Sequence, residues 1–178
     1  VIDAKGDAVS MTTTVESLFG SGRMAGGFFL NNQLTDFSLV PTALDGTPAA
    51  NAVAAGKRPR SSMSPALVLD REGRLVGLLG SPGGSSILAY NAKALIGALG
   101  WGLPLQEAFD LPNLVAKGDG FGADTEGFPL AVREGMAARG VELRPNTTET
   151  SGLHGGLWRN GRWDGGADSR REGVARTH

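Results

Sequence analysis

One stretch of the sequence, residues 75–100 (LVGLLGSPGGSSILAYNAKALIGALG), constrains the fold more than any other. It passes from an apolar run typical of a strand, through a glycine turn, into a segment with helical periodicity. The adjacent Gly83 and Gly84 allow successive backbone N–H groups to point the same way, at the positive end of the helix. This geometry suits a phosphate, a carboxylate or a developing oxyanion. We therefore expect a strand–turn–helix unit that binds negative charge.

Two other interpretations of this turn stay open on sequence alone. A phosphate-binding loop of the Walker type has the pattern G-x-x-x-x-G-K-[ST], and the turn contains no lysine, which disfavours a phosphate-binding β-loop-α module. Paired glycines also allow a helix to pack tightly against a sheet without any ligand. Of these interpretations, the sequence of the turn favours an anion or oxyanion site, with tight packing as the alternative.

The rest of the chain reads as strand pairs at both ends with helices between them. The apolar runs 66–70 and 75–79 predict a hairpin, which we expect to be covered on both faces. Asn160-Gly161 predicts a second hairpin, formed by 155–158 and 162–167. We also expect a hairpin of 1–4 with 8–15, helices over 86–99 (capped by Ser85 or Ser86), 105–109 and 129–139, an irregular segment over 33–64, and a surface tail from Asp168. This order predicts an α+β fold in one domain, residues 1–178.

Composition excludes several classes of protein. The 178 residues carry a formal charge of −1, which offers no basic surface for nucleic acid. No apolar run approaches the roughly 20 residues that a membrane-spanning helix needs. The chain has no cysteine, which excludes disulfides and thiolate chemistry. We expect His154 and His178 to be structural or incidental, and no metal site.

Two polar motifs offer groups for a substrate. In TTTVES, a strand would place Thr12, Thr14 and Glu16 on one face. In NNQLTDF, Gln33 and Asp36 supply an amide and a carboxylate suited to an ammonium group. Read separately, the first motif favours a half-exposed edge strand, and the second is only a weak signal because Asn and Asp also favour turns.

A third polar motif, KRPRSSMSP, places Ser61 and Ser62 beside two arginines. Arginine and serine together are suited to binding a carboxylate or a phosphate. The alternative for this motif is a solvated loop.

Taken in order, TTTVES, FLNNQLTDFS, GKRPRSSMSP and GSPGGSSI resemble the small, C-terminal subunit of γ-glutamyltransferases, members of the N-terminal nucleophile hydrolase superfamily. The resemblance extends through PLQEAFDLPNL and ADSRREG, over nearly the whole chain. It implies a four-layer αββα sandwich, completed by a large N-terminal subunit that autoprocessing releases from the same precursor. It also implies a periplasmic or extracellular location, with no cofactor.

The resemblance assigns roles to eight residues. The nucleophile of the family is the N-terminal threonine of the small subunit, activated by its own α-amino group. We expect it about five residues upstream of Val1, so that the chain as given lacks it. The implied roles are Thr14 as a hydrogen-bond partner of the nucleophile, Glu16, Gln33 and Asp36 for the substrate's α-amino group, Ser61 and Ser62 for its α-carboxylate, and Gly83 and Gly84 as the oxyanion hole.

The function that the resemblance implies is transfer or hydrolysis of the γ-glutamyl group of glutathione and related compounds. One alternative is a cephalosporin or glutaryl amidase of the same superfamily, which needs no ammonium site; Asp36 and Glu16 argue against it. A second is a catalytically inactive homologue, suggested by the absent threonine.

Overall fold

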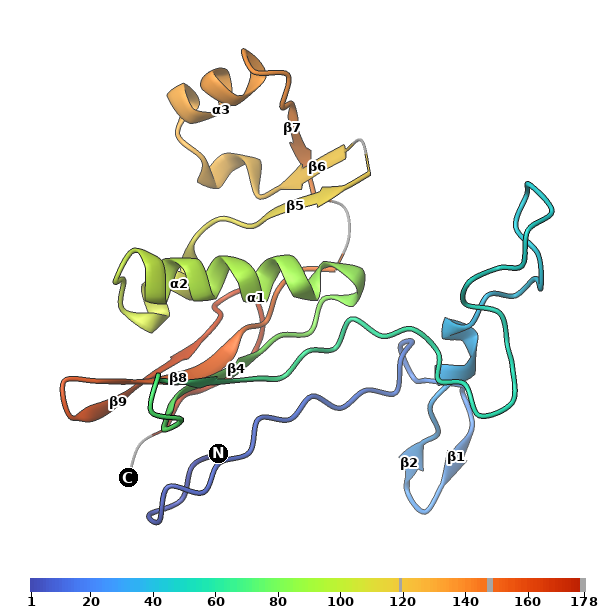
Figure 1. Ribbon diagram of the computed structural model, residues 1–178, viewed down its shortest axis with the longest axis horizontal. Helices are drawn as coiled ribbons and strands as arrows, with labels where there is room; N and C mark the ends of the chain where they lie inside the picture. Colours follow the sequence, from blue (N-terminus) through green and yellow to red (C-terminus); the bar gives the residue numbers. More distant parts are fainter. Residues whose placement is uncertain (119, 147–148, 177–178) are drawn as a thin grey trace. The chain divides into compact units, whose positions relative to one another are not determined.

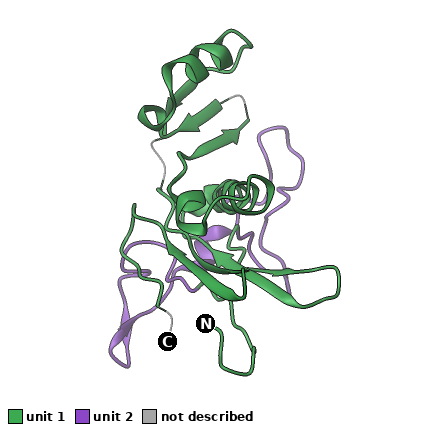
Figure 2. Ribbon diagram, turned by 90° about the vertical axis from the view of Figure 1, so that its left-hand side faces the viewer, with its two compact units in different colours: residues 1–12, 62–178 green, residues 13–61 purple. Residues whose placement is uncertain are grey.

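The computed structural model describes residues 1–118, 120–146 and 149–176 (Figure 1). The chain divides into two compact units: unit 1 comprises Val1–Thr12 and Ser62–His178, and unit 2 comprises Thr13–Ser61 (Figure 2). Unit 1 holds the α-helices and the longer strands. The single catalytic domain expected over residues 1–178 stays a prediction. No helix in the described part of the chain has the length and apolar character needed to cross a bilayer.

The largest sheet of unit 1 has four antiparallel strands, in the order β3 (Ala66–Leu69), β4 (Leu75–Gly80), β8 (His154–Arg159) and β9 (Arg162–Ala167). Both predicted hairpins are confirmed. At the tip of the second, Asn160 and Gly161 have φ values of 51° and 78°, as a type I′ turn requires. The mixed α+β class predicted from sequence is therefore what the structure shows.

Helices α1 (Ile87–Leu95) and α2 (Leu105–Asp110) lie over one face of this sheet (Figure 1). A π-helical turn (Ile96–Gly100) continues α1, so the helix ends close to the predicted position. The core between the layers contains Leu79, Tyr90, Ala94, Phe109 and Leu153. The expected cover on both faces is not complete at β3, where Leu67 and Leu69 stay more than half exposed.

The predicted serine cap of α1 is wrong. A 3₁₀ turn (Gly84–Ser86) leads directly into the helix, and the side chain of Ser86 makes no cap hydrogen bond. The backbone N–H of Ser86 already bonds to the carbonyl of Gly83 at 3.0 Å. Because the chain enters the helix through helical backbone, no extended N-cap residue is present to turn its hydroxyl back onto the first N–H groups.

A second, three-stranded sheet of unit 1 was not predicted. It contains β5 (Leu114–Lys117), β6 (Gly120–Ala123) and β7 (Leu143–Pro145); β6 pairs antiparallel with β5 and parallel with β7. Its strands are only three or four residues long and β6 has glycine at two of its four positions, so alternation of apolar residues does not reveal them. Helix α3 (Leu130–Ala137) connects β6 to β7 within the predicted range 129–139, and Gly140, with φ 79°, follows its end.

The N-terminal hairpin is much shorter than predicted. A single antiparallel bridge joins Ile2 to Ala8, and residues 9–16 form no strand. A strand requires a ladder of hydrogen bonds to a neighbour, and the isolated backbone bonds Val9 N–H to Val1 O and Asn32 N–H to Val15 O do not form one.

Unit 2 consists of short elements joined by turns. Strands β1 (Met24–Ala25) and β2 (Phe28–Phe29) form a hairpin around two glycines with positive φ, and a 3₁₀ turn (Gln33–Asp36) follows. Beyond that turn the unit has only isolated bridges, which agrees with the irregular segment predicted from residue 33 onward.

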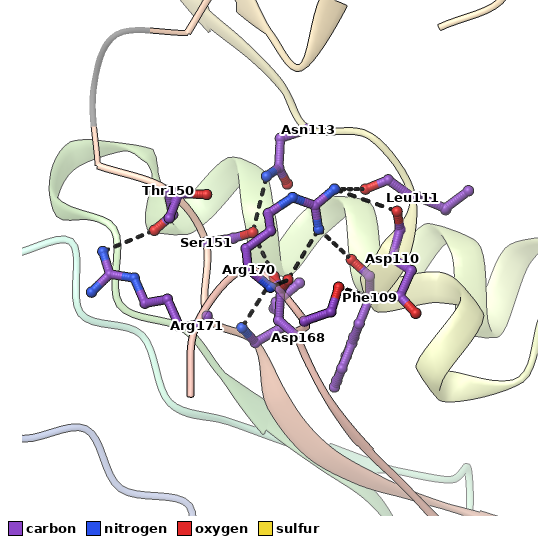
Figure 3. Close-up of polar contacts among 12 residues, drawn as sticks. Phe109, Asp110, Leu111, Asn113, Thr150, Ser151, Asp168, Arg170 and Arg171 are labelled. Carbon is purple, nitrogen blue, oxygen red and sulfur yellow. Dashed lines mark hydrogen bonds and ion pairs between the residues drawn. The ribbon is translucent and has the colours of Figure 1, made fainter. Parts of the chain in front are cut away.

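The tail that begins at Asp168 is not a surface segment at its start. The Asp168 carboxylate is buried and accepts hydrogen bonds from Ser151 Oγ at 2.5 Å and from Arg170 Nη1 at 3.0 Å (Figure 3). The same guanidinium donates to the carbonyls of Phe109 and Leu111, at the C-terminal end of α2. Burial acts to raise the pKa of Asp168, but the hydrogen bonds from Ser151 and Arg170 outweigh it, and the pKa lies below its ordinary value. The prediction failed because Ser151 and the carbonyls that Arg170 contacts lie far from this tail in sequence.

Lys93 on α1 adds a second cation to this region. Its Nζ donates to the carbonyls of Phe109 at 2.8 Å and Leu111 at 2.7 Å, which Arg170 also contacts. Burial, and then repulsion by Arg170, lower the pKa of Lys93 from 10.5 to about 8.

We predict that Lys93 makes the protein more stable as the pH rises above about 8. The folded state releases the Lys93 proton at about pH 8 and the unfolded state at about 10.5, so between these values the unfolded state binds more protons. Stability from this group therefore increases with pH in that window. Urea unfolding at pH 7, 8, 9 and 10 should show an increase in the wild type, relative to Lys93→Met, that begins near pH 8. The same comparison with Lys5→Met, an exposed residue, should show no such difference. If the free energy of unfolding changed with pH in the same way in wild type and Lys93→Met, the prediction would be contradicted.

We predict that Gly155→Ala destabilises unit 1 and that the neighbouring Gly156→Ala does so far less. A Cβ on Gly155 would lie 2.5 Å from the carbonyl oxygen of Leu78, so β4 and β8 would have to separate. A Cβ on Gly156 would meet the ring of Trp163 at 3.5 Å, an ordinary contact. Overpacking of this kind costs about 1–3 kcal/mol. Equal unfolding midpoints in urea for the two variants would show that the sheet accommodates both.

Candidate functional site

The turn between β4 and α1 can be built only with glycine. Gly83 has φ 132° and Gly84 has φ 52°, and both values lie where residues with a side chain are strained. A Cβ on Gly83 would also lie 2.5 Å from Cε2 of the Tyr90 ring. The turn therefore serves tight packing at Gly83, as one sequence interpretation held, while it also forms the start of a helix. These two roles are compatible with an anion site.

The side chain of Tyr90 packs directly against the turn at Gly83. The tyrosine is fully buried, and its hydroxyl donates to the carbonyl of Glu149 at 2.7 Å and accepts from Asn146 Nδ2 at 3.1 Å. Ser81, just before the turn, accepts the backbone N–H of Gly152 at 3.1 Å. Segment 149–152 thus packs against the turn, and Ser151 within it is held by Asp168 (Figure 3).

The fold brings charged groups to a turn that has none in its own sequence. Lys117, at the end of β5, donates to Ser85 Oγ at 2.7 Å. The carboxylate of Glu149 lies next to Gly84, and it pairs with Arg171 at 3.4 Å. Sequence reasoning missed Lys117, because it lies on a strand that the apolar pattern did not predict.

Ser62 is the one predicted carboxylate-binding residue that lies in unit 1. Its Oγ donates to the carbonyl oxygen of Gly84 at 2.5 Å. The structure therefore brings together Ser62, Gly83 and Gly84, three of the eight residues predicted for the site. The other five lie in unit 2: Thr14, Glu16, Gln33, Asp36 and Ser61.

Within unit 2, Thr14 and Glu16 lie together, although not on a strand face. Thr14 Oγ1 accepts the backbone N–H of Glu16 at 2.8 Å, and Glu16 has φ 74°. The predicted strand face is therefore wrong, because this side-chain hydrogen bond favours a turn over extended backbone. Glu16 Oε2 accepts from Ser17 Oγ at 2.5 Å and from Asn32 Nδ2 at 2.6 Å, and the bond from Ser17 contributes most to holding the pKa of Glu16 below its ordinary value.

Gln33 and Asp36 form a second pair in unit 2. Gln33 Nε2 donates to Asp36 Oδ2 across the 3₁₀ turn. Asn51 holds the backbone on both sides: its Nδ2 donates to the carbonyl of Asp36 at 2.5 Å, and its Oδ1 accepts the N–H of Arg60 at 3.1 Å. This oriented carboxylate can accept hydrogen bonds from an ammonium group. No sequence pattern indicated Asn51, because it acts through backbone groups that lie far from it along the chain.

The two histidines considered in the sequence analysis do not belong to the groups of site residues described above. His154 Nδ1 lies 2.8 Å from the carbonyl of Gly152, which is in keeping with a structural role, and His178 lies outside the described residues. Across the described ranges, no group of three or more histidine, aspartate or glutamate side chains is placed to hold a metal ion.

Comparison with known proteins places these features in one family. The family model for gamma-glutamyltranspeptidase matches residues 1–177. The chain is 32% identical to the glutathione hydrolase proenzyme of Bacillus subtilis (strain 168) over 179 residues, and 36% identical to that of Escherichia coli (strain K12) over 162 residues. These alignments cover 98% and 78% of the chain, but only 29% and 27% of the relatives.

A solved structure agrees with the sequence matches. The chain superposes on gamma-glutamyltranspeptidase from Pseudomonas nitroreducens, in its W525D mutant, with a TM-score of 0.83 and 31% identity. This match covers 100% of the chain and 96% of the crystallised chain. The chain therefore belongs to the gamma-glutamyltranspeptidase family, and it spans less than a third of the length of the curated relatives named above.

Proposed function

We propose that this chain is the small catalytic subunit of a γ-glutamyltransferase that transfers or hydrolyses the γ-glutamyl group of glutathione and similar compounds. The observation that carries the proposal is the family match over residues 1–177. In the proposed reaction, a threonine upstream of Val1 attacks the γ-carbonyl carbon, and the amine leaves. Water or a second amine then resolves the γ-glutamyl-threonine ester.

The oxyanion of the tetrahedral intermediate is assigned to the turn at Gly83 and Gly84. Positive φ values at both glycines and the start of a helix directly after them support this assignment. Ser62, bonded to Gly84, and Ser61 are assigned to the α-carboxylate of the substrate. A donor aimed at a developing oxyanion contributes about 3–4 kcal/mol to catalysis in comparable enzymes.

The α-amino group of the substrate is assigned to Glu16, Gln33 and Asp36. The lowered pKa of Glu16 keeps its carboxylate ionised, and Gln33 orients the carboxylate of Asp36. Thr14 is assigned to the hydroxyl of the nucleophile. A glutaryl amidase would need no such pair of carboxylates, which favours a γ-glutamyl substrate over that alternative.

A larger N-terminal subunit, released from the same precursor by autoprocessing, is the proposed partner. It would complete the four-layer αββα sandwich, in a periplasmic or extracellular location. Apolar side chains that need cover support this: Leu67, Leu69, Leu88 and Trp101 in unit 1, and Leu18, Phe19 and Phe28 in unit 2, are all more than half exposed.

We predict that Asp36→Asn lowers kcat/KM for γ-glutamyl donors by tens- to thousands-fold in the processed two-subunit enzyme. The change removes a charge assigned to the substrate's ammonium group, and losing such a partner costs about 2–5 kcal/mol. The loss should be much smaller for a glutaryl donor, which has no ammonium group. Asp45→Asn, in an exposed turn of the same unit, is the matched control and should change neither rate. An equal loss of kcat/KM for both donors would show that Asp36 does not bind the ammonium group of the substrate.

We predict that Gly84→Ala lowers kcat by about 10²–10³-fold and changes KM much less. A methyl group at φ 52° strains the turn and shifts an N–H that acts mainly in the transition state. Precursor cleavage passes through a similar intermediate, so the assay should use protein shown by mass to be cleaved. A lowered melting temperature with unchanged kcat per titrated active site would reduce the turn to a packing role and refute the assignment.

A further inference from the structure

A pocket of about 170 Å³ lies in unit 1 where β5, β6 and β7 meet. The residues that line it include the apolar Val115 and Phe121 and the polar Lys117, Arg144 and Asn146. None of the roles proposed above uses this pocket. It therefore offers a second place where a small molecule with both apolar and anionic parts can bind.

Two contacts join the pocket to the turn at Gly83 and Gly84. On one side, Lys117 Nζ reaches Ser85 Oγ at 2.7 Å, one residue beyond Gly84. On the other, Asn146 Nδ2 donates to the hydroxyl of Tyr90, whose ring lies directly against Gly83. The pocket is consequently a neighbour of the turn, within the same unit.

The charges in the pocket favour an anion. Lys117 and Arg144 both line it. Arg144 has a nearby carboxylate, Glu142, at 3.3 Å, but both side chains are largely exposed, so their ion pair is weak. Glu149, whose carboxylate lies next to Gly84, is paired with Arg171. The ammonium group of Lys117 bonds to a neutral hydroxyl and keeps further donors for a carboxylate.

From these contacts we propose that the pocket binds the carboxylate of the amine that leaves, or accepts, the γ-glutamyl group, with Lys117 as its main contact. The amine class is an amino acid or a dipeptide. This inference rests on the proposed function and extends it to the acceptor side. The nitrogen of the amine is bonded to the carbon whose oxyanion the turn holds. In a dipeptide, the terminal carboxylate lies about 7 Å from this nitrogen. A pocket next to the turn can therefore bind the carboxylate while the nitrogen is at the reacting carbon.

The test measures transfer by the processed two-subunit enzyme from γ-glutamyl-p-nitroanilide, a donor whose leaving group has no carboxylate. Glycylglycine and glycylglycinamide are compared as acceptors, because they differ only in the terminal carboxylate. The measured quantity is the ratio of kcat/KM for the two acceptors. In the wild type this ratio should favour glycylglycine. Lys117→Gln should reduce it about tenfold, since a charge-assisted hydrogen bond is lost, and Lys117→Arg should retain most of it.

Lys5→Gln is the matched control, since it removes an exposed lysine of the same unit at its N-terminal turn and should keep the wild-type ratio. A ratio that is the same in Lys117→Gln and wild type, or a wild type without preference for the carboxylate, would overturn the subsite while γ-glutamyl transfer itself stands. A wild type that releases no p-nitroaniline would overturn the proposed function and the subsite together.

Discussion

The ring of Tyr90 leaves no space for a side chain at position 83, and much of unit 1 is arranged around this constraint. The tyrosine is fully buried on α1, with its ring against Gly83 and its hydroxyl between Glu149 and Asn146. It therefore fixes the path by which β4 enters α1, and the segment that leads into β8. A buried hydroxyl with both a donor and an acceptor partner holds this geometry without an unsatisfied polar group.

A series of polar contacts connects the glycine turn to Asp168 and Arg170 in the C-terminal segment. Segment 149–152 lies against the turn, Ser151 within it bonds to Asp168, and Arg170 connects Asp168 to carbonyls at the C-terminal end of α2. Buried carboxylate and guanidinium groups are costly unless they are paired, so this network is sensitive to loss of any member. The geometry of the proposed oxyanion site thus depends on residues that are distant from it in sequence and that take no part in its chemistry.

The candidate site could be predicted in part, and the limits have physical causes. Gly83, Gly84 and Ser62 were identified from motifs, and the structure brings them together because these motifs flank one strand pair. Lys117 could not be found, since β5 is only four residues long and shows no alternation of apolar and polar residues, and its partner β6 is equally short and contains two glycines. Thr14 and Glu16 lie next to each other as predicted, but in a turn, because a side-chain hydrogen bond competes with extended backbone there.

The sequence by itself determined the local features: the two long hairpins, the three helices, the glycine turn and the motifs that carry the family resemblance. Short-range backbone preferences dictate these features, such as positive φ at Asn160-Gly161 and at Gly83-Gly84. Only the tertiary structure decided which distant polar groups meet: Ser151 donates to Asp168, and Lys93 and Arg170 share the carbonyl of Phe109. Such pairs depend on how sheets and helices pack, and no periodicity along the chain encodes that packing.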